Sequence, residues 1–195
     1  MATYALYIYD ASSFTQGFSQ WFGAGDGATS NAAAQGTALK TGTLSGQMIA
    51  VSDTNSFLND DPTAGSQVLA EDVTINGVTY AAGTAISVDY AIEGDANGTQ
   101  NNVGMLAIRI GSTIVGVAVI DPTKDNYIDI NVALEPNSTY TFDAISNYDG
   151  SRAKQPYTSL ITCFTVGTRI DTAHGPVAIE ELAVGDLVLT RDHGP

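Results

Sequence analysis

The sequence predicts an all-β protein with a β-sandwich or jelly-roll-like domain at its N-terminal end. Short runs of alternating or β-branched residues recur along residues 1–146, and turn-forming residues separate them roughly every 8–12 positions. No segment has persuasive helical periodicity. Hydrophobic residues make up 44% of the 195 residues and charged residues only 14%, so the chain is expected to fold around a core.

The first predicted strand is followed by a long loop. Aromatic and aliphatic side chains alternate in residues 4–9, which predicts a strand with an aromatic face. Residues 17–46 are rich in glycine, serine and threonine, a composition typical of loops. The aromatic residues at its start, Phe18, Trp21 and Phe22, either anchor this loop in the core or form a platform for stacking sugars.

Further strands follow at short spacing. Asn76-Gly77 predicts a tight hairpin, because both central residues of the favoured turn need a positive φ. Gly111-Ser112 joins the two most apolar runs of the chain and predicts a central hairpin. The predicted strands are residues 47–52, 68–75, 78–81, 84–92, 105–110, 113–120, 127–134 and 139–146.

The chain is expected to divide into two parts. Residues 1–155 are predicted to form the β-sandwich domain and residues 163–195 a separate C-terminal segment. Between them, residues 156–162 are predicted to be a linker, because the stretch that leads into them is polar and contains Pro156.

Charge and composition exclude several classes of partner. The net charge of −14 repels phosphate backbones, so no nucleic-acid partner is expected. No run of about 18 apolar residues exists, so no membrane span is expected. The single cysteine leaves no intramolecular disulfide. The β-rich composition favours a secreted or cell-surface protein, although the N-terminus lacks the basic and apolar regions of a Sec signal peptide.

The C-terminal segment carries the most specific motif. Its residue pattern resembles the first block of Hint (Hedgehog/intein) domains, of the bacterial type found behind a β-rich domain. The resemblance covers residues 163–195 and identifies residues 1–155 as a passenger domain. The matching positions are Cys163-Phe164, Gly167-Thr168, a turn at Gly175, Ile179-Glu180, Leu182, Gly185-Asp186 and Val188-Leu189-Thr190.

The resemblance implies self-processing chemistry at one peptide bond. Cys163 would attack the carbonyl carbon of Thr162 in an N–S acyl shift and convert the Thr162–Cys163 peptide bond into a thioester. A thiol suits this step because it is a strong nucleophile even when partly ionised. The leaving amide nitrogen needs a proton, so a general acid is also required. Hydrolysis of the thioester by water would then release residues 1–162, or another nucleophile would accept them. No cofactor is needed.

One part of the family pattern is not present. Hint domains carry a second block with a Thr and a His three residues apart, and these 195 residues contain no such block. The two histidines, His174 and His193, fall at turn or tail positions of the first block and do not match it. The Hint domain is therefore expected to be incomplete here, and the 195-residue chain to be inactive in self-processing.

A second class of function remains open. Cys163 can also be read as a small buried hydrophobic residue, which would leave the N-terminal domain as an extracellular structural or binding module with an inactive Hint remnant. Its partner would be calcium, a glycan or another copy of itself. Asp95, Asn97 and Thr99 alternate in a polar loop and are the candidate calcium ligands, although the complete EF-hand pattern is not met.

Overall fold

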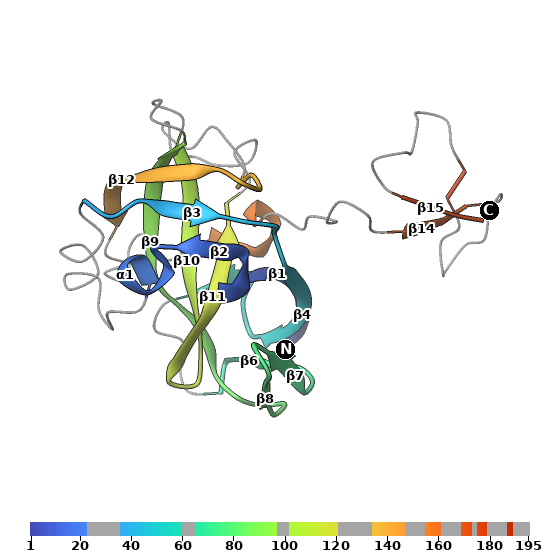
Figure 1. The fold of residues 1–195 in the computed structure, drawn as a ribbon. Coiled ribbons are helices and arrows are strands. Elements are labelled where there is room, and N and C mark those ends of the chain that lie inside the picture. Colours follow the sequence, from blue (N-terminus) through green and yellow to red (C-terminus); the bar gives the residue numbers. More distant parts are fainter. Residues whose placement is uncertain are drawn as a thin grey trace. The chain divides into compact units, whose positions relative to one another are not determined.

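A computed structural model gives the fold of the chain (Figure 1). The chain divides into two compact units, Met1–Thr162 and Cys163–Pro195, and each is described by itself. The structure describes residues 1–22, 36–59, 65–96, 102–120, 134–146, 155–160, 169–172, 175–178 and 187–188.

The first unit is built around one antiparallel sheet of nine strands, in the order β2-β3-β12-β9-β10-β11-β1-β4-β6. The all-β prediction is therefore confirmed. The strands of this sheet are β1 (Ala2–Asp10), β2 (Phe14–Gln16), β3 (Leu39–Thr41), β4 (Gly46–Asp53), β6 (Gln67–Leu69), β9 (Ile86–Ala96), β10 (Asn102–Ile110), β11 (Thr113–Val119) and β12 (Thr139–Ser146). Two smaller sheets accompany it, pairing β5 (Phe57–Leu58) with β13 (Gln155–Pro156) and β7 (Val73–Ile75) with β8 (Val78–Tyr80).

Both faces of the large sheet are covered by apolar side chains. In β1, Leu6 and Ile8 belong to one core cluster, and Tyr7 and Tyr9 belong to the other. Strands β1 and β2 are six places apart in the strand order, yet only the three-residue 3-10 helix η1 (Ala11–Ser13) separates them along the chain, so the sheet coils back on itself. The facing layers of this sandwich-like core are therefore parts of one sheet. Burial on both faces also explains why β10 is an almost continuous apolar run.

The two predicted hairpins are confirmed. Asn76 and Gly77 have φ values of 52° and 77° between β7 and β8, as a tight turn of this type requires. Gly111, with φ 60°, lies between β10 and β11. The strand predicted at 68–75 is interrupted, because β6 ends at Leu69 and β7 begins at Val73. Most of the strand predicted at 127–134 lies outside the described residues.

The loop predicted for residues 17–46 is wrong over part of its length, because helix α1 (Phe18–Phe22) and strand β3 fall within it. The spacing of Phe18, Trp21 and Phe22 places three aromatic rings on one side of a helical turn. Trp21 and Phe22 are completely buried against the sheet. This tertiary packing outweighs the weak helix propensity of the surrounding sequence.

The linker predicted for residues 156–162 is also wrong over residues 156–160, which pack into the first unit. Strand β13 ends at Pro156, the 3-10 helix η2 covers Tyr157–Ser159, and Leu160 forms an isolated bridge with Ile120. Tyr157 and Leu160 are members of a core cluster. We call Gln155–Leu160 the closing segment of the first unit.

The described part of the second unit is a hairpin. Strands β14 (Arg169–Thr172) and β15 (Gly175–Ala178) pair in antiparallel register, and Thr172 also bridges Val188. No helix among the described residues of either unit is long and apolar enough to cross a membrane.

Candidate functional site

The predicted scissile bond is flanked by described structure on both sides. Thr162 and Cys163 themselves lie outside the described residues, and so do His174 and His193. The closing segment ends two positions before Thr162, and β14 begins six positions after Cys163. The division between the two compact units falls between Thr162 and Cys163, at the bond that the sequence pattern singles out.

On the upstream side of the predicted scissile bond, backbone pairing attaches the closing segment to the first unit. Gln155 and Pro156 pair in register with Leu58 and Phe57 of β5. The backbone N–H of Tyr157 donates to the carbonyl oxygen of Ser56 over 3.2 Å. Leu160 then bridges Ile120, the residue that follows β11. The chain is therefore attached to two different parts of the first unit within six residues.

The side chain of Tyr157 adds a polar anchor in the core. Its hydroxyl donates to Oδ2 of Asp53 over 2.8 Å, and its ring stacks on Tyr4 with a centroid distance of 4.3 Å and an interplanar angle of 2°. Asp53 is 0% exposed, and its Oδ1 accepts from the backbone N–H of Asn55 over 2.9 Å. Burial, followed by the bond to Asp53, raises the pKa of Tyr157. A buried carboxylate of this kind depends on such partners.

The hairpin on the downstream side has a tight connection. Thr172 pairs with Gly175, and its hydroxyl donates to the carbonyl oxygen of Gly175 over 2.7 Å. Gly175 has a φ of 105°, a conformation that favours glycine. The sequence pattern puts a turn at Gly175, and in the structure the return strand β15 begins at that residue.

The candidate calcium site is described only in part. Asp95 lies near the end of β9, opposite Asn102 of β10 and Thr141 of β12. Asn97 and Thr99 lie outside the described residues. Within the described ranges, no three His, Cys, Asp or Glu side chains are grouped closely enough to hold a metal ion. The calcium assignment therefore stays a prediction.

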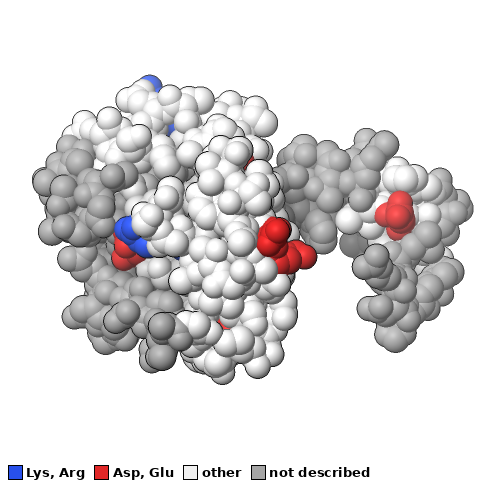
Figure 2. Space-filling view, turned by 90° about the horizontal axis from the view of Figure 1, so that it is seen from below, with Lys and Arg blue, Asp and Glu red and all other residues white. Residues whose placement is uncertain are grey.

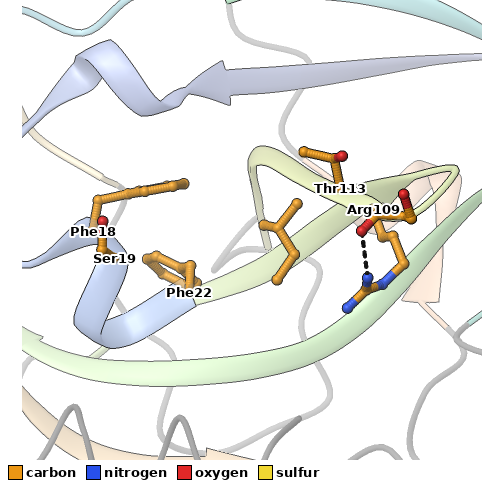
Figure 3. Close-up of a pocket in the computed structure, with 7 residues that line it drawn as sticks. Phe18, Ser19, Phe22, Arg109 and Thr113 are labelled. Atoms are coloured by element: carbon orange, nitrogen blue, oxygen red, sulfur yellow. Dashed lines mark hydrogen bonds between the residues drawn. The ribbon is translucent and has the colours of Figure 1, made fainter. Parts of the chain in front are cut away.

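The first unit also contains a shallow pocket of about 290 Å³ between α1 and the β10–β11 hairpin (Figure 3). Arg109 is one of its lining residues, with Nε and Nη2 bonded to the carboxylate of Asp89 at 3.0 and 2.6 Å and Nη1 bonded to the carbonyl oxygen of Ser112 at 3.0 Å. The pocket is lined by Phe18, Ser19, Phe22, Arg109, Ser112, Thr113 and Ile114.

The pocket does not reproduce the suggested sugar platform. Trp21 is 0% exposed, and its Nε1 donates to the carbonyl oxygen of Thr37 over 2.8 Å. A completely buried indole cannot stack on a ligand, so the core reading of Trp21 is confirmed. On the face shown in Figure 2, the few basic side chains are scattered and do not form a patch among the described residues.

Sequence reasoning did not find the closing segment or its partners Asp53 and Tyr4. The only available signal was the pair of apolar residues, Tyr157 and Leu160, at the end of a polar stretch. Two side chains are too few to define a period, and Asp53 and Tyr4 lie about 100 and 150 residues before Tyr157 in the sequence, so only the fold reveals their role.

Comparison with known protein families supports the assignment of the C-terminal motif. Residues 162–195 match the family described as Hint domain, and this confirms the resemblance of the C-terminal segment to a Hint domain. The match covers the C-terminal 34 residues of the chain. Neither a curated protein nor a solved structure matched the chain.

Proposed function

We propose that this chain, whose residues 162–195 match the Hint domain family, is a self-processing precursor. In this proposal Cys163 is the nucleophile and residues 1–162 are the passenger that is released or transferred. The main support for the proposal is that the start of the family match and the division between the two compact units coincide. The family match begins at residue 162, and the division between the two compact units falls directly after that residue.

The reaction needs no group beyond the protein and an acceptor. The sulfur of Cys163 attacks the carbonyl carbon of Thr162, the C–N bond of the peptide breaks, and the nitrogen takes a proton from a general acid. The product is a thioester between Thr162 and the Cys163 side chain. An acceptor then attacks the same carbonyl carbon, displaces the thiolate and takes the passenger as its acyl group.

The integrity of the passenger supports this site of cleavage. The closing segment belongs to the first unit, so a cut after Thr162 leaves its backbone pairing with β5 and its Tyr157–Asp53 bond in one fragment. A cut before residue 155 would separate buried side chains from their core. Cleavage at Thr162 therefore releases a passenger with all of its described contacts.

The experiment uses the chain extended through a second Hint block, which would supply the general acid. Incubation with excess low-mass thiol is expected to yield the thioester of residues 1–162, detected by intact-mass spectrometry. Cys163→Ala is expected to abolish the product, and Cys163→Ser to slow it strongly because a hydroxyl is a weaker nucleophile at neutral pH. Thiol-dependent cleavage that persists in Cys163→Ala would rule out this nucleophile.

The second candidate function is an extracellular calcium-binding module, favoured by the position of Asp95 at the end of β9, close to the connection to β10. If Asp95, Asn97 and Thr99 bind calcium, millimolar calcium is expected to raise the melting temperature by several degrees. The control is Asp95→Asn, which should lose the shift. An identical melting temperature with calcium and with chelator would eliminate this candidate.

A further inference from the structure

The pocket between α1 and the β10–β11 hairpin combines apolar side chains with hydrogen-bonding groups (Figure 3). Phe18 and Phe22 line it from the helix, and Ile114 adds an aliphatic side chain from β11. Its polar lining residues are Ser19, Arg109, Ser112 and Thr113. A ligand that fits this lining has an apolar surface and polar groups on the same small molecule.

The pocket has room for a single ring. Its volume of about 290 Å³ lies at the lower end of the roughly 300–1,000 Å³ typical of small-molecule sites. Trp21 and Phe22 are completely buried, but Phe18 is only half-buried. The ring of Phe18 can therefore pack against one face of a ligand.

The charges around the pocket favour a neutral ligand. The guanidinium of Arg109 is bonded to both carboxylate oxygens of Asp89, at 3.0 and 2.6 Å, so its positive charge is balanced within the protein. The net charge of −14 on the whole chain also repels anions. An anionic ligand would thus have to compete with Asp89 for Arg109 in an unfavourable field.

The backbone gives Arg109 a fixed position in the lining. The register of β10 against β11 shifts between Ile108 and Arg109, an irregularity of the β-bulge kind. Such bulges redirect a side chain and are frequent next to functional sites. The bonds to Asp89 and to the carbonyl oxygen of Ser112 orient the guanidinium before any ligand arrives. A side chain ordered in advance loses little entropy on binding.

From this lining we propose that the pocket binds one pyranose ring of a neutral sugar. A pyranose presents C–H groups on its face and hydroxyl groups around its edge. Its face would pack on Phe18 and Ile114, and its hydroxyls would meet the polar side chains of the hairpin and of Ser19. The site belongs to the passenger and does not depend on the proposed self-processing.

The test records the amide NMR spectrum of the 195-residue chain with the methyl glycosides of glucose, galactose, mannose and N-acetylglucosamine. At least one of the four is expected to bind with a Kd of about 1 mM, as befits so small a ligand. The shifted amides should lie in α1 and the β10–β11 hairpin. Benzoate and benzyl alcohol are the comparison ligands, an anionic ring and a ring with a single hydroxyl.

Two variants remove one part of the lining each. Thr113→Val replaces an exposed hydroxyl with a methyl group and is expected to raise the Kd of the best glycoside about threefold to tenfold. Phe18→Ala removes the packing ring and is expected to raise it at least about tenfold. The amide spectrum of each variant shows directly that the chain is folded.

Each variant has a matched control outside the pocket. Thr3→Val makes the same change at an exposed position of β1, and Phe57→Ala removes a phenylalanine that is 38% exposed in β5. Both controls should leave the Kd unchanged within about twofold, as is usual for surface substitutions.

The outcomes separate the sugar site from its alternatives. Glycoside-dependent shifts in α1 and the hairpin that both pocket variants weaken support it. No shift with any of the four glycosides, shifts confined to other elements, or pocket variants without effect overturn it. Tighter binding of benzoate or benzyl alcohol than of every glycoside overturns the choice of ligand. None of these results bears on the proposed thioester.

Discussion

The hydroxyl of Tyr157 joins the closing segment to a carboxylate that has no exposure to solvent. Tyr157→Phe keeps the ring stack on Tyr4 and removes only this hydrogen bond. Because Asp53 then loses a partner while it remains buried, the free energy of unfolding is expected to fall by about 1–3 kcal/mol. Urea denaturation of the full chain measures the loss.

A double-mutant cycle gives the control for this prediction. Asp53→Asn and the double variant Asp53→Asn/Tyr157→Phe complete the cycle, and the coupling energy between the two positions should be at least ~0.5 kcal/mol. Additive effects would mean that the hydroxyl and the carboxylate contribute independently.

The raised pKa of Tyr157 also predicts a dependence of stability on pH. Its ordinary pKa is 10.0, and desolvation raises the value in the folded state. Above pH ~10 the unfolded chain loses the phenolic proton while the folded chain retains it, so stability is complete below that pH and declines as the pH rises. Tyr140, whose pKa burial also raises, contributes in the same direction.

The measurement for this prediction is the free energy of unfolding between pH 8 and pH 11. Tyr157→Phe should show a shallower decline above pH ~10 than the parent chain, by up to one proton. An unchanged slope in the variant would show that Tyr157 ionises equally in both states.

At the scale of elements, the closing segment is expected to behave as part of the passenger core. A chain that ends at residue 154 lacks Tyr157 and Leu160 and exposes the surfaces they cover, whereas one that ends at residue 162 retains both. Burial of two such side chains contributes about 3–5 kcal/mol, so the shorter chain should unfold at markedly lower urea concentration. Equal midpoints for the two chains would contradict this role.

The elements that the sequence predicted well are those with a strong local signal. The hairpin at Asn76-Gly77 depends on turn residues that tolerate positive φ, and the apolar β10–β11 pair depends on burial of both faces. Helix α1 and the closing segment were missed for the opposite reason. Both are only a few residues long, and tertiary contacts with distant side chains stabilise them.

At the scale of the whole molecule, the two compact units divide between Thr162 and Cys163, and the residues before that division are attached more firmly than the sequence suggests. The motif at residues 163–195 was recognised from local residue identities, and the family match agrees with it. The preceding residues were expected to form a linker because they are polar and contain Pro156. Their attachment to Asp53, Tyr4 and Ile120 depends on the coiled sheet, and local composition cannot reveal it.

The proposed self-processing depends on an acyl bond between Thr162 and the sulfur of Cys163. Hydroxylamine cleaves thioesters and leaves a hydroxamate on the acyl carbon, so it marks the site directly. The most direct measurement is therefore tandem mass spectrometry of the fragment formed when the chain extended through a second Hint block is treated with hydroxylamine at neutral pH. We expect a passenger that ends in a hydroxamate of Thr162, and a fragment that ends at any other residue, or an intact chain, would contradict the proposed thioester.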